Sequence, residues 1–393
     1  GDVLGVTQPA CDVDFYALGG DSLLLSRMIA RLRQQLPAAA ELEWEVLLRH
    51  LLREPTIRAR AERLRHSRRE QQAVAEVRSA LVPLWGDQAP GGRCCVFVHA
   101  GTGNLLPYQH LLQALDRTAW PRGIGVELPQ QEAFTDLPPD RALTRLAARY
   151  ADELARQGDE FTLIGYCLGG LLAAEIARML TEQGKTVTEL VAISAYQPPH
   201  VEADALVDYI FARALGASPQ RLAMPEEPSL AAAVREILQA QPGRIARHAF
   251  DQLDDRHCGV RDSFAAWSSR PLDQRLAQLS AGGQADGIYH QPDGADLSFA
   301  RQHALFGHSM ASVGLHRPDA WLGRTVLLRN SASDPLLPGT PQDVAGYWRD
   351  ICLGDLVIDD IAGDHFSCLS RAHASKLAAL IATSSVTVLP CSV

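Results

Sequence analysis

The chain has 393 residues, of which 47% are apolar and 21% charged, close to the composition of an average folded globular protein. Its 37 Lys and Arg against 46 Asp and Glu give a net charge of −9, so nucleic acid is not expected as a main partner. The sequence shows neither a run of about 18 apolar residues nor a secretory leader pattern. We therefore expect a cytoplasmic protein with no membrane partner. The sequence begins with Gly1 rather than with methionine, so we expect it to be a piece of a longer chain.

The first part of the chain predicts a small helical unit. Apolar side chains recur every three or four positions over residues 22–36, which is the spacing of one buried helix face, and Pro37 follows. A second helical pattern covers residues 42–52, and Thr56 is a candidate cap for a third helix. We assign this unit to residues 1–66.

An arginine-rich segment follows the helical unit. Seven arginines lie between Arg53 and Arg69, against only two glutamates, and the sequence then loses periodicity up to Gly92. We interpret residues 67–92 as a linker. The arginines fit a solvated helix face better than a docking surface for an acidic partner domain, although both interpretations remain open.

From residue 93 onward, short apolar strands alternate with amphipathic helices, which predicts an α/β fold with a parallel sheet covered on both faces. The predicted strands are residues 94–99, 123–128, 161–166, 189–194, 324–330 and 356–362, and the predicted helices are residues 107–116, 140–157, 169–183, 341–352 and 368–383. A mostly helical segment, about residues 196–322, interrupts this alternation and is too long for an ordinary connection. We interpret it as a lid inserted into a domain that spans residues 93–393.

The eight cysteines are scattered, with no CxxC pair and no histidines at zinc-binding spacing, so neither a metal site nor a disulfide framework is predicted. Cys167 differs from the others. It is the centre of Gly165-Tyr166-Cys167-Leu168-Gly169, which closes an apolar strand and opens an apolar helix, as in a nucleophile elbow with cysteine in place of serine. The helix N-terminus should favour its thiolate, so we predict that Cys167 is a catalytic nucleophile.

A cysteine nucleophile needs a base, and His365 has the right place in the sequence. It follows the last predicted strand and precedes the closing helix, where an elbow-type enzyme carries its histidine. His99, at the end of the first strand, is expected to shape the adjacent loop rather than to move protons.

The third catalytic group is predicted to be Asp334. The strand that follows the elbow helix ends in Ser194, so the first possible place for an acid is empty, and Asp334 is the next acid after a strand. Asp359 and Asp360 lie on a strand and are poorly aimed, and Asp364 is too near His365 in sequence to reach around its ring.

Two backbone N–H groups should stabilise the oxyanion. One is that of Leu168, directly after the nucleophile, and the other belongs to Gly101 or Thr102 in the loop after the first strand. The glycines of this loop do not complete a dinucleotide fingerprint, so a dehydrogenase is not expected.

Two segments carry a family resemblance. The motif LGGDSL at residues 18–23, with PTI at 55–57, resembles the peptidyl carrier domains of nonribosomal peptide synthetases, with the carrier's first helix truncated or missing. Residues 93–393 resemble the type I thioesterase domains of these synthetases, which are α/β-hydrolases with a helical lid. The resemblance implies that Ser22 carries 4'-phosphopantetheine, attached by a phosphopantetheinyl transferase. It also implies that the carrier domain docks on the thioesterase domain and that upstream synthetase domains supply a peptidyl thioester.

Two departures from the family pattern bear on the reaction: the nucleophile is Cys167 instead of serine, and Ser194 occupies the usual place of the acid. Thioesterases with cysteine resemble those that close strained four-membered lactams or lactones in antibiotic biosynthesis, including the monobactam-forming kind. We therefore favour release by cyclisation, through an acyl intermediate on Cys167, over release by hydrolysis. The alternatives are hydrolytic release, editing of wrongly loaded acyl groups, or a non-catalytic carrier and degenerate-hydrolase scaffold.

Overall fold

The computed structural model describes residues 6, 10–19, 22–36, 56–58, 79–86, 91–129, 131–285, 296–330 and 341–386. Within these ranges a seven-stranded sheet has the order β1-β3-β2-β4-β5-β8-β9. All neighbouring strands are parallel except β1 and β3, which are antiparallel. The strands are β1 (Leu81–Trp85), β2 (Arg93–Val98), β3 (Arg122–Val126), β4 (Glu160–Tyr166), β5 (Thr186–Ile193), β8 (Thr325–Asn330) and β9 (Leu356–Ile361). The predicted α/β fold with a parallel sheet is confirmed.

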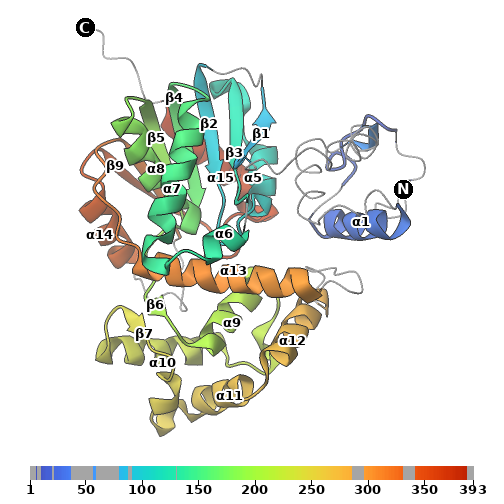
Figure 1. The fold of residues 1–393 in the computed structure, drawn as a ribbon, viewed down its shortest axis with the longest axis vertical. Coiled ribbons are helices and arrows are strands. Elements are labelled where there is room, and N and C mark those ends of the chain that lie inside the picture. Colours follow the sequence, from blue (N-terminus) through green and yellow to red (C-terminus); the bar gives the residue numbers. More distant parts are fainter. Residues whose placement is uncertain are drawn as a thin grey trace.

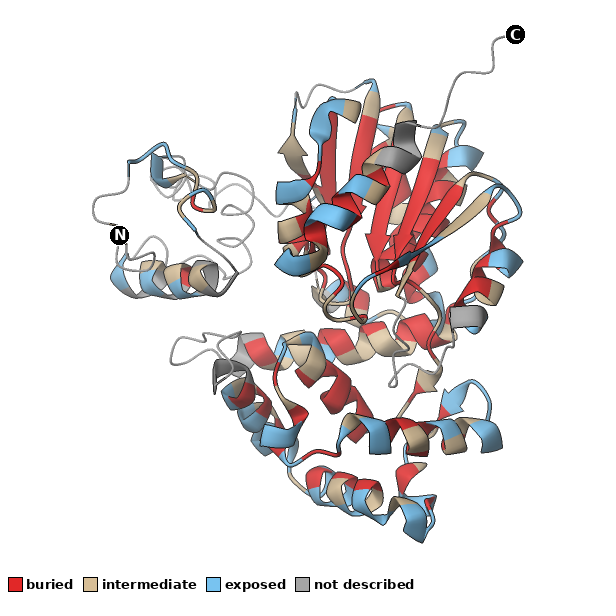
Figure 2. Ribbon diagram, turned by 180° about the vertical axis from the view of Figure 1, so that it is seen from behind, coloured by how far each residue is buried: buried red, intermediate tan, exposed pale blue. Residues whose placement is uncertain are grey.

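Helices cover both faces of the sheet (Figure 1). One face packs against α7 (Pro139–Ala155), α8 (Leu168–Glu182) and α14 (Pro341–Ile351), and the other against α5 (Gln109–Ala114) and α15 (Arg371–Val386). Successive side chains of a strand point to opposite faces, so in β2 Val96 belongs to the first core and Phe97 to the second. This double burial explains the unbroken apolar runs of the central strands, which are buried along almost their whole length (Figure 2).

The strand β1 lies inside the segment that the sequence indicated as a linker. It forms the edge of the sheet, where its backbone pairs with that of β3, and Trp85 packs over Gly123. Five residues with Pro83 in their middle show no usable periodicity, and proline is tolerated only because an edge strand leaves some N–H groups without a partner strand. Backbone pairing with β3, rather than a pattern in its own residues, therefore explains why β1 is a strand.

The inserted segment between β5 and β8 forms an apolar core of its own, separate from the two cores on the faces of the sheet. It contains β6 (His200–Val201), α9 (Asp204–Ala214), α10 (Glu227–Ala240), β7 (Arg244–Ile245), α11 (Cys258–Ser268), α12 (Leu272–Ala285) and α13 (Asp296–Leu315). The long helix α13 lies between this core and the sheet domain, where it contacts α7 and α6 (Gln131–Thr135) (Figure 1). The insert thus covers the edge at which the parallel strands end.

A buried carboxylate ties four parts of the insert together. Asp208 on α9 is 1% exposed and accepts hydrogen bonds from Trp267 Nε1 at 2.8 Å, from His303 Nε2 at 2.6 Å and from Arg275. Its partners lie on α11, α13 and α12. Because a buried charge without partners is costly, this cluster fixes the mutual arrangement of the helices.

In the first part of the chain, α1 (Ser22–Gln35) begins at Ser22, as its apolar spacing predicted. Phe15 and Ile29 are buried, and Arg58 pairs with Asp12, which joins residues on either side of α1 in sequence. The helix predicted at residues 42–52 lies outside the described residues. No helix in the described part of the chain is long and apolar enough to cross a membrane.

Candidate active site

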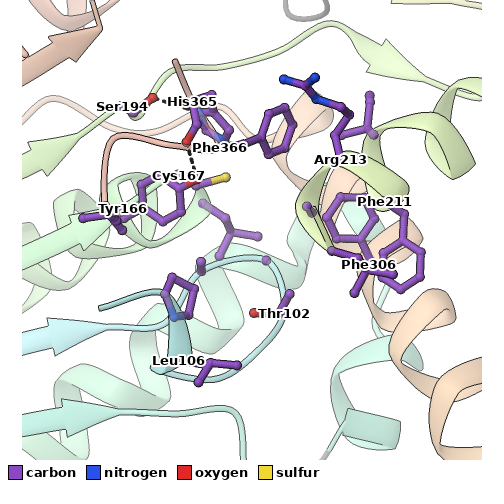
Figure 3. A pocket seen from close by; sticks show the side chains of 18 of the residues that line it. Thr102, Leu106, Tyr166, Cys167, Ser194, Phe211, Arg213, Phe306, His365 and Phe366 are labelled. Atoms are coloured by element: carbon purple, nitrogen blue, oxygen red, sulfur yellow. Dashed lines mark hydrogen bonds between the residues drawn. The ribbon is translucent and has the colours of Figure 1, made fainter. Parts of the chain in front are cut away.

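Cys167 occupies the sharp turn between β4 and α8, with a positive φ of 57° and a ψ of −129°. Non-glycine residues are seldom found there, and such strain costs of the order of 1–3 kcal/mol. The turn is held by hydrogen bonds from Cys167 N to Ile193 O (3.1 Å) and from Gly170 N to Cys167 O (3.0 Å). The strained backbone places the thiol in a cavity above the strand ends (Figure 3).

Glycines surround the turn because there is no room for side chains. A Cβ atom on Gly165 would lie 2.1 Å from Gly169 O, one on Gly169 would lie 2.5 Å from Val98 O, and one on Gly170 would lie 2.3 Å from the Ala195 Cβ. These distances are all shorter than any van der Waals contact. Steric crowding therefore explains the glycines on either side of Cys167.

His365 lies in the loop after β9 and lines the same cavity as Cys167. Its side chain is 6% exposed and stacks on Tyr166, with ring centroids 5.2 Å apart, while Tyr196 and Phe366 contact it edge-on. The Tyr166 hydroxyl donates a hydrogen bond to the backbone oxygen of His365 (2.5 Å), which ties the loop of His365 to the residue before Cys167. The structure thus brings together Cys167 and His365, separated by almost 200 positions in sequence.

Tyr108 holds the residue before Cys167 in place through hydrogen bonds of its hydroxyl group. Its hydroxyl accepts a hydrogen bond from Tyr166 N (2.6 Å) and donates one to Val98 O (2.7 Å), so one buried side chain connects the ends of β4 and β2. Burial raises the pKa of Tyr108 and of Tyr166 far above the ordinary tyrosine value, so both hydroxyls stay protonated. Sequence reasoning missed these tyrosines because only the folded structure shows their partners.

Ser194 is the direct partner of the histidine ring. Its Oγ lies 2.8 Å from His365 Nδ1, and it also donates a hydrogen bond to Asn330 Oδ1. The predicted acid, Asp334, lies outside the described residues, so its position relative to the ring stays a prediction. The sequence shows no acid at the end of β5. The structure shows that the hydroxyl group of Ser194, at this position, contacts the imidazole of His365.

Two other acids near His365 have partners of their own. Asp360 pairs with Arg329 (2.7 Å), and Asp364 accepts hydrogen bonds from the N–H groups of Phe366 and Ser367. Burial by itself raises the pKa of Asp364, but hydrogen bonds from Ser367 and the charge of Arg213 outweigh it, so the pKa lies below its usual value. Asp364 therefore holds the loop as a carboxylate.

The loop after β2 lines the same cavity as Cys167. Gly101 and Thr102 line the cavity together with Cys167 and Leu168, and the Ser309 hydroxyl on α13 donates to Gly101 O (3.0 Å). Gly103 adopts φ 77°, which lets the loop turn towards the cavity. The two predicted sources of oxyanion donors thus line one cavity, and their role as donors stays a prediction.

His99 supports this loop and lies in the core, 3% exposed. Its Nδ1 lies 2.7 Å from Ala100 O and its Nε2 lies 2.8 Å from the Tyr150 hydroxyl. Burial lowers the pKa of His99 to about 4, so the ring is neutral. This agrees with the expected role of His99 in shaping the loop.

The depressed pKa of His99 has a consequence for stability. Below about pH 6.5 the unfolded chain gains a proton at this position that the folded protein does not, so the free energy of unfolding should fall as the pH is lowered towards 4. At about 1.4 kcal/mol per pKa unit, this residue should account for a loss of about 2 kcal/mol between pH 7 and pH 5. Urea unfolding of His99→Gln at both pH values should show a correspondingly smaller loss. An equal loss in His99→Gln and the parent would contradict the prediction, and His248→Gln, which removes an exposed imidazole, is the control.

The cavity has a volume of about 650 Å³ and is mostly apolar. Its walls come from the sheet domain and from the insert, chiefly α9 and α13, and the apolar lining includes Leu106, Ile210, Phe211, Phe306, Met310 and Val313. Arg213 on α9 lies above Phe366 and pairs with Asp364 and Glu227, so its charge is neutralised (Figure 3). The described residues contain no group of three or more metal-ligating side chains. The cavity shared by Cys167 and His365 is therefore suited to an apolar group.

Two family models match the chain. Residues 94–283 match the thioesterase domain, and residues 1–64 match the phosphopantetheine attachment site. The chain therefore combines a region that carries covalent phosphopantetheine with a thioesterase domain, which is an enzyme of the α/β-hydrolase fold.

Similar proteins include parts of larger synthetases. Pyochelin synthetase PchF of Pseudomonas aeruginosa is 33% identical over 95% of this chain, and phenyloxazoline synthase MbtB of Mycobacterium tuberculosis is 29% identical over 51%. These matches cover 20% and 16% of the relatives, so the chain spans about a fifth of the length of the first. A crystal structure of a four-domain nonribosomal peptide synthetase, holo-AB3403, matches 99% of this chain and 25% of its own, with a TM-score of 0.55 and 19% identity, a likeness that concerns the fold alone.

Proposed function

We propose that this chain is the carrier and release portion of a nonribosomal peptide synthetase, and that it releases a peptide from phosphopantetheine on Ser22 through an acyl intermediate on Cys167. The observation that supports the proposal best is the common cavity of Cys167, in a strained elbow, and His365. The carrier region would be residues 1–66, joined by residues 67–92 to a thioesterase domain of residues 93–393 with its lid at about 196–322. Upstream synthetase domains would supply the peptidyl thioester, and a phosphopantetheinyl transferase would load the carrier, which docks on the thioesterase domain.

The first chemical step is an exchange between two thioesters. The Cys167 sulfur attacks the acyl carbonyl carbon, the carbon–sulfur bond to phosphopantetheine breaks, and the proton of the Cys167 thiol passes through His365 to the departing pantetheine thiol. The N–H of Leu168 and that of Gly101 or Thr102 stabilise the oxyanion. Since a thioester is replaced by a thioester, the acyl group remains activated for the second step.

We propose that the second step is cyclisation. An internal amine or hydroxyl of the acyl group attacks the Cys167 thioester and the thiolate leaves, with the proton of the nucleophile returned through His365. The apolar cavity supports this step, because the internal nucleophile competes with water for the same carbonyl. A four-membered lactam or lactone is the ring that the resemblance suggests, and hydrolytic release or editing is the alternative within the same site.

Mass spectrometry of the product distinguishes these outcomes. A synthetic peptidyl pantetheine thioester, incubated with the protein, should yield a product lighter by one water than the free acid. Release of the free acid alone would contradict cyclisation and favour hydrolysis. If neither product forms faster with the protein than without it, the result would favour the non-catalytic scaffold.

We keep Asp334 as a proposed acid for His365. Asp334→Asn should slow acyl transfer, although by less than the ~10⁴-fold loss seen when the carboxylate of a serine triad becomes an amide, because a thiol and an imidazole form an ion pair without it. Single-turnover measurement of acyl transfer to Cys167 tests this. An unchanged rate in Asp334→Asn would exclude Asp334 from the catalytic group.

A further inference from the structure

Two neutral side chains at the ends of β5 and β8 form a chain of hydrogen bonds to His365: Ser194 contacts the ring, and Asn330 contacts Ser194. Ser194 directly follows β5 and Asn330 is the last residue of β8, and these strands are neighbours in the sheet. Ser194 adopts φ 45°, a left-handed conformation that is uncommon for a residue with a side chain, and its N–H donates to Leu328 O at 2.8 Å. The serine is 3% exposed and the histidine 6%. Both are therefore shielded from bulk water.

The hydrogen bonds define a direction from Asn330 to His365. Asn330 Nδ2 donates to Gly363 O (3.2 Å), so its Oδ1 faces Ser194. The Ser194 hydroxyl donates its proton to this Oδ1, and its lone pairs are then directed to His365 Nδ1 at 2.8 Å. Nδ1 must therefore carry the proton, and Nε2 is left as the unprotonated nitrogen.

We propose that Ser194 and Asn330 are positioning residues that hold His365 as the Nδ1–H tautomer, so that the group in direct contact with Nδ1 is a neutral hydroxyl and any effect of Asp334 on the ring is indirect. Together they supply the acceptor for Nδ1–H that a catalytic histidine requires. Asn330 also ties the end of β8 to the turn at Gly363, two residues before His365. This inference rests on the proposed role of His365 as base.

A neutral acceptor has a different electrostatic effect from a carboxylate. A carboxylate would stabilise the imidazolium strongly, whereas a hydroxyl stabilises it by a hydrogen bond alone. The thiolate and imidazolium pair of Cys167 and His365 should therefore form at a higher pH than it would with an acid at position 194. The pH at which Cys167 becomes reactive reports this difference directly.

Other ionisable groups near the ring are the same in the parent and in variants of Ser194. Tyr166 and Tyr196 contact the ring, and Cys368 donates to His365 O at 3.6 Å. Burial raises the pKa of Tyr166 well above its usual value and that of the Cys368 thiol to about 12, so these two groups stay neutral in the working range. Asp364, next to His365, is paired with Arg213 on α9. A shift between parent and variant therefore arises at position 194.

The test is the rate at which iodoacetamide alkylates Cys167 between pH 5 and 9, read by mass spectrometry of the peptide that contains it. Ser194→Ala removes the acceptor of Nδ1–H, so the pH midpoint of alkylation should rise by about one unit. Ser194→Asp adds a carboxylate, which the left-handed backbone tolerates, and the midpoint should fall by about one unit. Acyl transfer in Ser194→Ala should slow by roughly 10- to 100-fold, less than the ~10⁴-fold loss in serine triads.

A matched control is Ser312→Ala. Ser312 is fully buried on α13, and its hydroxyl donates to His308 O (2.7 Å), away from the ring of His365. Its loss should lower stability without moving the alkylation midpoint. A merely structural role for Ser194 would give the same pattern and would overturn the proposal.

Asn330→Asp provides an independent test of the same hydrogen bonds if Ser194→Ala does not fold. Asn330→Asp places a carboxylate next to the Ser194 hydroxyl and should lower the midpoint. Unchanged midpoints in the folded variants of Ser194 and Asn330, or a larger shift in Asp334→Asn than in Ser194→Ala, would overturn the proposal. Alkylation needs no acyl substrate, so this failure is distinct from failure of the proposed release reaction, which Cys167→Ala tests.

Discussion

Cys167→Ala should abolish product release and leave the acyl chain on the phosphopantetheine of Ser22. Without the thiol there is no group to accept the acyl chain, and loss of a catalytic nucleophile costs of the order of 10⁶-fold in kcat. Intact-protein mass spectrometry after loading with an acyl-coenzyme A and a phosphopantetheinyl transferase should show the acylated carrier persisting in this variant and disappearing in the parent. The matched control is Cys258→Ala, which removes an exposed cysteine on α11. Release by Cys167→Ala at the parent's rate would exclude Cys167 as the nucleophile.

Cys167→Ser separates the role of sulfur from the role of a nucleophile. The serine variant should still form an oxoester or hydrolyse it slowly, but cyclisation should fall much further, because an alkoxide is a poorer leaving group than a thiolate. The ratio of cyclic to hydrolysed product, measured by mass spectrometry, should therefore drop. Formation of the cyclic product at the parent's rate would show that the thioester is not needed for ring closure.

The second large effect is expected at Ser22. Ser22→Ala should prevent all attachment of phosphopantetheine, because the proposed attachment is to the hydroxyl of Ser22, at the start of α1. Incubation with a phosphopantetheinyl transferase and coenzyme A should add the mass of one phosphopantetheine to the parent and none to the variant. Ser26→Ala, one turn later in the same helix, is the matched control and should be modified like the parent. Modification that persists in Ser22→Ala would place the attachment elsewhere.

Local patterns were sufficient to predict most of the sheet domain. The central strands are buried on both faces, so each reads as an apolar run, and the helices between them show one apolar face. The elbow was equally clear, because Gly165 and Gly169 lie where any Cβ would collide with backbone. His365 followed from its place after the last strand. These features depend on neighbours in sequence, and a sequence displays such neighbours directly.

Only the tertiary structure shows that β1 is a strand and which residues surround His365. β1 exists because the edge of β3 offers backbone groups for pairing, and its own five residues carry no period. Ser194, Asn330 and His365 come from three segments, and only the parallel alignment of β5, β8 and β9 brings them together. By itself the sequence determined the fold class, the nucleophile and the base as predictions. It could not show what holds the base, because that depends on hydrogen bonds between residues more than 30 positions apart.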